Sequence, residues 1–174
     1  LVLVGVAVKR EVEQAVSRWD KIPEYGDIEI GFDVARYGDD LSALCWRWGN
    51  KVYPIDTWQG ASIPENIGLI LNKVGEIRKQ TKYLKPIKVK VDDGGVGGGV
   101  TDGLMLDREH GIEVVPCNFG GMGTDDYENE GSVMWGRIRS EIDHIGLPDD
   151  QNLSAELSTR KYAITPKGKI RIEP

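Results

Sequence analysis

Cysteine and histidine are scarce in this sequence, which limits the chemistry that it can carry. The 174 residues include two histidines, His110 and His144, too few for a histidine-rich metal site. The two cysteines, Cys45 and Cys117, lie far apart in apolar, strand-like runs. We therefore expect two buried free thiols in a reducing cytosol rather than a disulfide.

Long apolar runs are also missing. No stretch approaches the roughly 20 apolar residues that a membrane-spanning helix needs, so no membrane partner is expected. The apolar residues 1–8 are too few for a signal peptide, and no charged segment precedes them. The first residue is Leu rather than Met, so we expect an excised piece of a longer protein.

The sequence motifs of P-loop nucleotide binding and of serine hydrolases are both absent. The glycine-rich residues 94–99 do not complete a GxGxxG pattern, because Val100 stands where the last glycine would be, and no GK[ST] follows. No Gly-x-Ser-x-Gly elbow surrounds Ser42, Ser132 or Ser154. The sequence therefore does not support a P-loop nucleotide site or a serine hydrolase.

Basic residues are outnumbered by acidic ones, 22 to 28, which gives a net charge of −6. A DNA-binding domain that works alone is normally basic, so the charge counts against a nucleic-acid partner. A site that collects carboxylates for metal ions is acidic by design, however, and a neighbouring domain can hold the DNA. The length and the 40% hydrophobic content suit one globular domain.

The spacing of apolar residues predicts alternating strands and helices. We expect an amphipathic helix at 9–20 and a linker at 21–27 that contains Pro23 and Gly26. The sequence Ser62-Ile63-Pro64-Glu65 is a capping box that begins a later helix. Strands are predicted at 28–33, 41–48, 51–58, 87–91, 112–117, 161–165 and 169–173, and further helices at 62–77, 100–109 and 133–145.

This order of elements predicts an α/β fold. Three adjoining strands come first, and crossover helices then separate the later strands. We expect a mixed sheet, with three antiparallel strands followed by parallel strands, and helices on both of its faces.

Asp33 is the first candidate for chemistry, because it interrupts the otherwise apolar strand IEIGFDVA. Alternation sets it on the face opposite Ile28, Ile30 and Phe32, next to the small Gly31. Aspartate disfavours strands, so we interpret Asp33 as a functional carboxylate rather than a solvated one.

Asp92 and Asp93 are the second candidates, because they end the strand KPIKVKV. Carboxylates at the carboxyl end of a strand commonly face a ligand crevice. Adjacent aspartates point to opposite sides, so we expect only one of them to join Asp33 and the other, Asp93, to act as a helix cap or turn residue.

Carboxylates from adjacent strands are suited to metal-assisted phosphodiester hydrolysis. Their oxygen atoms match Mg²⁺ or Mn²⁺, and two such ions can activate water and stabilise the leaving oxygen. The glycines that follow, including Gly95 and Gly97, would let a nucleic-acid backbone come close. Other acidic residues, Asp39 and Asp40 among them, suit turns better than metal sites.

Four segments, in order, resemble the large subunit of tailed-phage terminases. They are IGFDVARYGDD, VKVDDGGVGGGVTDGL, NEGSVMWGRIRSEIDHIGLPDD and LSTRKYAITPKGKIRIEP. The resemblance implies the family's C-terminal nuclease domain, with a ribonuclease H-like fold and an acidic triad that binds two divalent metal ions. Its first acid corresponds to Asp33 and its second to Asp92, with Asp93 as the second choice. Its third acid follows the terminal hairpin, and this chain ends at Pro174, before that segment.

The resemblance also implies a division of the chain and a set of partners. Residues 1–26 would be a linker helix after an absent ATPase domain, and residues 27–174 the nuclease domain without its extreme C-terminal segment. The implied activity is a metal-dependent endodeoxyribonuclease that cuts concatemeric viral double-stranded DNA during packaging in the host cytoplasm. The terminase small subunit, the portal and the protein's own ATPase domain are the implied partners, and Arg36, Arg137, Arg139 and Lys161 are candidate phosphate contacts.

Other functions remain open on the same scaffold. A Holliday-junction resolvase or a sugar-kinase-like phosphotransferase would use a similar fold. A non-catalytic docking module of a packaging motor is the third alternative.

Overall fold

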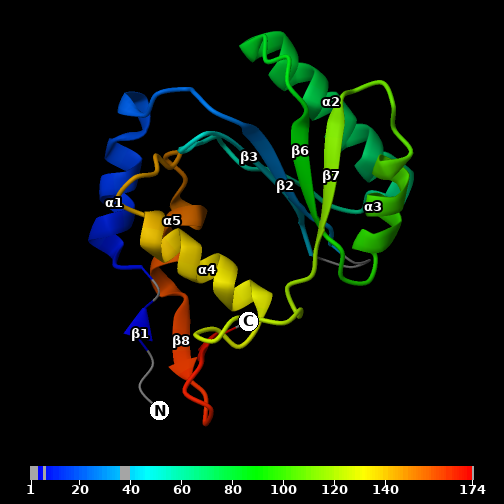
Figure 1. Ribbon diagram of the computed structural model, residues 1–174. Coiled ribbons are helices and arrows are strands. Elements are labelled where there is room, and N and C mark those ends of the chain that lie inside the picture. Colours follow the sequence, from blue (N-terminus) through cyan, green and yellow to red (C-terminus); the bar gives the residue numbers. More distant parts are fainter. Residues whose placement is uncertain (1–3, 6, 36–39, 174) are drawn as a thin grey trace. The chain divides into compact units, whose positions relative to one another are not determined.

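The computed structural model describes residues 4–5, 7–35 and 40–173 (Figure 1). Its contacts divide the chain into two compact units. We call Tyr25–Gly49 with Ile55–Cys117 the sheet unit, and Leu1–Glu24 with Asn50–Pro54 and Asn118–Pro174 the helical unit. In the described part of the chain, no helix is both long and apolar enough to cross a membrane.

The sheet unit contains a mixed sheet. Its elements are β2 (Ile28–Asp33), β3 (Ser42–Trp48), β5 (Asp56–Trp58), α2 (Ile63–Thr81), β6 (Ile87–Asp92), α3 (Gly97–Met105) and β7 (Ile112–Cys117). The strands lie in the order β3-β2-β6-β7, and β5 pairs with β3. The β2–β3 and β3–β5 pairs are antiparallel, whereas β2–β6 and β6–β7 are parallel. The predicted change from antiparallel to parallel pairing is confirmed.

The helices α2 and α3 lie on one side of this sheet, as Figure 1 shows beside β6 and β7. Phe32 on β2 stacks on the indole of Trp58 at a centroid distance of 5.5 Å. The Trp58 indole nitrogen in turn donates to the side-chain oxygen of Asn66 on α2 at 2.7 Å. This face of the sheet is apolar and buried. Its buried strand residues include Ile28, Ile30, Phe32, Leu44, Trp46, Ile87, Val89 and Val91.

Local sequence defines both ends of α2. The predicted capping box is present, since the Ser62 amide donates to the Glu65 carboxylate at 2.7 Å and the Ser62 hydroxyl accepts from the Glu65 amide at 3.4 Å. The helix ends at Thr81, and its C-cap residue Lys82 adopts a left-handed conformation with φ +58°.

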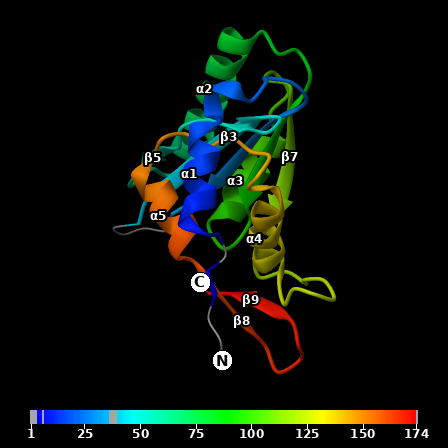
Figure 2. The same ribbon diagram turned by 90° about the vertical axis from the view of Figure 1, so that its left-hand side faces the viewer.

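The helical unit is shown in Figure 2, where α1 and α5 lie side by side. Its elements are β1 (Val4–Gly5), α1 (Lys9–Ser17), a 3₁₀ turn (Trp19–Lys21), β4 (Lys51–Val52), α4 (Glu130–Glu141), α5 (Gln151–Thr159), β8 (Lys161–Ile164) and β9 (Ile170–Ile172). Strands β1, β8 and β9 form a small antiparallel sheet. The core cluster comprises Ala7, Val12, Ala15, Ile142, Leu147 and Leu157. Arg18 also donates to the carbonyls of Ile142 and Ile145, so residues near both ends of the chain share one core.

Several predicted boundaries are wrong for identifiable reasons. The predicted third strand is divided into β4 and β5, because Pro54 interrupts it. Helix α3 begins at Gly97, inside the glycine run, and α4 begins at Glu130, where Asn129 caps it through the Ser132 amide at 2.8 Å. Helix α5 was not predicted, because it is only 9 residues long and fully buries only Leu157.

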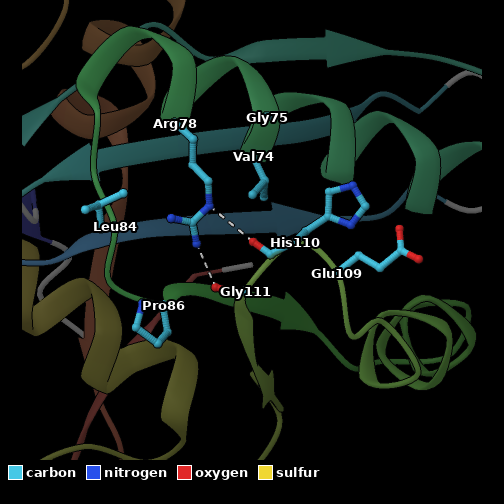
Figure 3. A pocket seen from close by; sticks show the side chains of 8 residues that line it. All are labelled: Val74, Gly75, Arg78, Leu84, Pro86, Glu109, His110 and Gly111. Atoms are coloured by element: carbon cyan, nitrogen blue, oxygen red, sulfur yellow. Dashed lines mark hydrogen bonds between the residues drawn. The ribbon is translucent and has the colours of Figure 1, made fainter.

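Arg78, near the end of α2, forms hydrogen bonds with two loops. Its guanidinium donates to the carbonyls of Tyr83 at 2.7 Å and Lys85 at 3.2 Å. It also donates to the carbonyls of His110 at 3.2 Å and Gly111 at 2.8 Å (Figure 3). One side chain thus satisfies four backbone acceptors at the amino ends of β6 and β7.

We expect Arg78→Ala to lower the free energy of unfolding by about 2 kcal/mol, because four charge-assisted hydrogen bonds lose their donor. Urea denaturation of the variant would measure this loss. Lys79→Ala is the control, since Lys79 is the next residue on α2 and is exposed. Equal stability of the two variants would contradict the assigned role of Arg78.

Candidate metal centre

Asp33 and Asp92 come together at the carboxyl ends of two parallel strands. The pairing of β2 with β6 extends to Phe32 and Val91. Asp33 and Asp92 are the next residues on the two strands, so the same register brings them side by side. On the other side of Asp33 stands Ala43 of β3, whose small side chain leaves room beside the carboxylate.

The two carboxyl groups interact electrostatically. Asp33 is an exposed residue, but neighbouring atoms partly desolvate its carboxyl group and so raise its pKa above the ordinary value, and the negative charge of Asp92 raises this pKa further. A cation between the two groups would relieve this repulsion. The arrangement is therefore one that a divalent cation stabilises.

The turn after β6 differs from the prediction in one respect. Asp92, rather than Asp93, closes the turn, since its Oδ1 atom accepts a hydrogen bond from the Gly94 amide at 3.2 Å. Helix α3 has no side-chain cap, so Asp93 does not fill the first of its two expected roles, helix cap or turn residue; it lies in the loop that joins β6 to α3. Asp93 is exposed, and its amide donates to the carbonyl of Cys117 at 2.7 Å.

Gly95 and Gly97 each have a structural reason to lack a side chain. Gly95 is exposed and has φ +63°, a left-handed conformation that favours glycine. Gly97 is buried, and a Cβ atom there would lie 1.7 Å from the carbonyl oxygen of Asp92. The close approach of α3 to the end of β6 therefore needs glycine at position 97.

The remaining candidates lie elsewhere. Arg36 and Asp39 fall outside the described residues, and Asp40 is exposed. Arg137 and Lys161 are exposed in the helical unit. Arg139 forms an ion pair with Glu11 at 3.1 Å, also in the helical unit. Both cysteines are free, as expected, but each is half-buried rather than buried.

The donor set suits magnesium or manganese in its chemistry. Mg²⁺ usually binds through one or two carboxylates and keeps several water ligands. Asp33 and Asp92 supply two carboxylates of this kind. Across residues 4–5, 7–35 and 40–173, no group of three or more His, Cys, Asp or Glu side chains is placed to hold a metal ion.

A separate pocket of about 340 Å³ lies at the other end of the same strands. Figure 3 shows Arg78 among the residues that line it, together with Leu84, Pro86 and Gly111. Pro86 and Gly111 immediately precede β6 and β7, whereas Asp92 is the last residue of β6. The Arg78 guanidinium is committed to backbone carbonyls, so this pocket is a structural feature and not part of the carboxylate site.

Sequence reasoning missed a group of charged residues on the face that carries Asp33. Glu29 on β2 forms ion pairs with Arg47 on β3 and with Lys90 on β6. Their alternating positions, in IEIGFD and in KVKVD, are the signal that would have indicated a shared face.

Comparison with known proteins identifies the fold. No protein-family model and no curated protein sequence matches the chain. The nuclease domain of the large terminase subunit gp2 of bacterial virus Sf6 matches with a TM-score of 0.73 and 14% identity, over 98% of this chain and 88% of that chain. The large terminase nuclease from thermophilic phage G20c, with bound magnesium, matches with a TM-score of 0.60 and 14% identity, over 91% and 86%.

This chain has the fold of phage large-terminase nuclease domains. The large terminase of a second thermophilic bacteriophage also matches, over 87% of this chain and 36% of that chain, with a TM-score of 0.53 and 13% identity. The predicted ribonuclease H-like α/β fold class is confirmed. The fold is shared although very little of the sequence is.

The raised pKa of Asp33 has a consequence for stability. Asp33 keeps its proton to higher pH in the folded chain than in the unfolded chain, where its pKa has the ordinary value of 3.8. As pH rises above 3.8, ionisation of Asp33 therefore costs the folded form stability. In EDTA, we expect Asp33→Asn to melt at a higher temperature than the parent at about pH 7 and to have no such advantage at about pH 3.

Asp102→Asn on the exposed surface of α3 is the matched control, with the same change of charge. It should leave the melting temperature unchanged at both pH values. Equal melting of Asp33→Asn and the parent at neutral pH would show that ionisation of Asp33 costs the fold nothing, either through desolvation or through the charge of Asp92.

Proposed function

We propose that this chain is a metal-dependent endonuclease domain that cuts concatemeric viral double-stranded DNA during genome packaging. The observation that carries the proposal is the pairing of Asp33 with Asp92 at the carboxyl ends of β2 and β6. The fold of phage terminase nuclease domains supports the same activity. Related structures were solved with manganese, magnesium and cobalt, which supports a divalent cation as the cofactor.

In this proposal, Asp33 and Asp92 hold the cations through their carboxylate oxygens. Both groups must be ionised to do so, and a bound cation favours ionisation because it offsets their mutual repulsion. Bound Mg²⁺ or Mn²⁺ would supply an activated water and stabilise the leaving oxygen of the phosphodiester. Ala43 and Gly31 leave the space beside Asp33 free of bulky side chains, so that a phosphate can approach.

Two further parts of the proposal rest on the terminase likeness. A third acidic ligand would follow the terminal hairpin, which ends at Ile172 in β9. The nuclease would act in the host cytoplasm beside its own ATPase domain, the small terminase subunit and the portal. Residues 1–26 would connect the ATPase domain to the nuclease domain that starts at residue 27, although α1 in this segment packs into the core of the helical unit through Val12 and Ala15.

We expect Asp33→Ala and Asp92→Ala each to lower plasmid cleavage with Mn²⁺ by at least about a hundredfold, because each removes a ligand of the proposed cations. The assay uses the chain together with any residues that naturally follow Pro174. EDTA should abolish cleavage by the parent protein. Cleavage of either variant at the parent rate would refute this site.

Two controls sharpen the assay. Asp93→Ala tests the neighbouring carboxylate and should retain most of the activity, whereas its inactivity would move the second ligand from Asp92 to Asp93. Asp102→Ala, on the exposed surface of α3, should cut like the parent.

Two other outcomes would favour the alternative functions. A preference for four-way junctions over plain duplex would favour a Holliday-junction resolvase, and failure of well-folded protein to bind Mn²⁺ would favour a docking module.

A further inference from the structure

The face of the sheet that carries Asp33 also carries a hydrogen-bonded cluster of one acidic and two basic side chains. Lys90 donates to the Oε2 atom of Glu29 at 2.6 Å, and Arg47 donates to the same oxygen at 2.9 Å. Alternation along β2 sets Glu29 on the same face as Gly31 and Asp33. We call Glu29, Arg47 and Lys90 the basic cluster.

The basic cluster carries an excess positive charge. One carboxylate faces two cations, so one unit of positive charge is left over. Burial would raise the pKa of Glu29, but its hydrogen bonds and ion pairs with Lys90 and Arg47 outweigh burial and lower this pKa. The Glu29 side chain is only 13% exposed, whereas Arg47 and Lys90 are 44% and 42% exposed. An ionised, shielded Glu29 thus holds two accessible cations in place.

A strip of exposed surface at Gly31, where no side chain projects, joins the basic cluster to the candidate metal centre. Gly31 lies between Glu29 and Asp33 on this face, and it is exposed. A Cβ atom at Gly31 would meet only the carbonyl oxygen of Cys45, at 4.0 Å. Lys90 stands beside Gly31 and two positions before Asp92, which is about 6.6 Å along a parallel strand.

We propose that Arg47 and Lys90, held by Glu29, bind the phosphate backbone of double-stranded DNA beside the scissile phosphate, with the DNA strand passing over Gly31. The proposal rests on the nuclease function argued above and adds the residues that position the substrate. Lys90 lies two positions from the carboxylates, and Arg47, which pairs with Glu29, lies four positions away. The two cations are thus placed to meet phosphates at successively greater distances from the scissile phosphate. Arg47 and Lys90 are positioning residues, because they do not touch the reacting atoms.

A purely structural role gives a different expectation. Cross-strand ion pairs can stabilise a sheet without binding anything. Loss of any one of the three side chains would then lower stability and leave DNA affinity unchanged. The sign of the change in DNA affinity therefore separates the two roles.

The test measures affinity for a duplex by fluorescence anisotropy in EDTA, at several salt concentrations. Lys90→Gln and Arg47→Gln should each weaken binding by about fivefold. Each should also reduce the slope of log affinity against log salt by about 0.9, which corresponds to one phosphate contact. Glu29→Gln should tighten binding, because it removes the negative charge that offsets both cations and leaves Arg47 bonded only to the Gly49 carbonyl, although all three variants lose thermal stability.

Matched controls make the same changes of net charge elsewhere. Lys79→Gln on α2 and Asp102→Asn on α3 alter exposed residues of the helices that cover the opposite face. Both should bind DNA like the parent. Lys90→Arg should restore the affinity that Lys90→Gln loses, and Gly31→Val should weaken binding without any change of charge because it fills the strip.

The proposal is overturned if Lys90→Gln and Glu29→Gln change affinity in the same direction, or by no more than the controls. Normal binding by Gly31→Val would exclude a path over Gly31. In the cleavage assay with Mn²⁺, Lys90→Gln should raise KM and leave kcat near the parent value. Absence of cleavage by the parent protein would count against the nuclease function, whereas the binding measured in EDTA still decides this inference.

Discussion

The pairing of β2 with β6 is the constraint on which the candidate site depends. Parallel pairing places Phe32 beside Val91, and the next residues, Asp33 and Asp92, are then neighbours at the carboxyl ends of both strands. A slip of one residue would turn every side chain of β2 to the other face, which would bury Asp33 and expose Phe32. Burial of Ile30, Phe32 and Val89 therefore fixes the position of the carboxylates as well as the sheet.

One face of the sheet stabilises the fold, and the other carries the charged residues of the candidate site. The apolar face is held by α2, through the contacts that join Phe32, Trp58 and Asn66. The other face carries Asp33, whose ionised carboxylate is costly to the fold, as its raised pKa indicates. Stability from the first face allows charged groups to be arranged on the second, which is a common feature of functional sites.

The sequence predicted the sheet and the two acids better than it predicted the helices of the second unit. Alternation in IEIGFD and in IKVKVD identified β2 and β6, because one face of each strand is buried. The capping box predicted the start of α2, because Ser62 and Glu65 satisfy backbone groups locally. Helix α5 was missed because it buries only Leu157, and the ion pairs of Glu29 could not be predicted because they depend on strand register. The closing of the turn by Asp92 instead of Asp93 is a backbone detail that residue type does not determine.

Anomalous diffraction from crystals grown with Mn²⁺ would test the central claim most directly, because it locates the ion itself. The account predicts a manganese peak between the carboxylates of Asp33 and Asp92, within about 2–2.5 Å of an oxygen atom from each. A well-ordered structure at saturating Mn²⁺, with no peak at these carboxylates or with the ion bound elsewhere, would contradict a metal centre at the ends of β2 and β6.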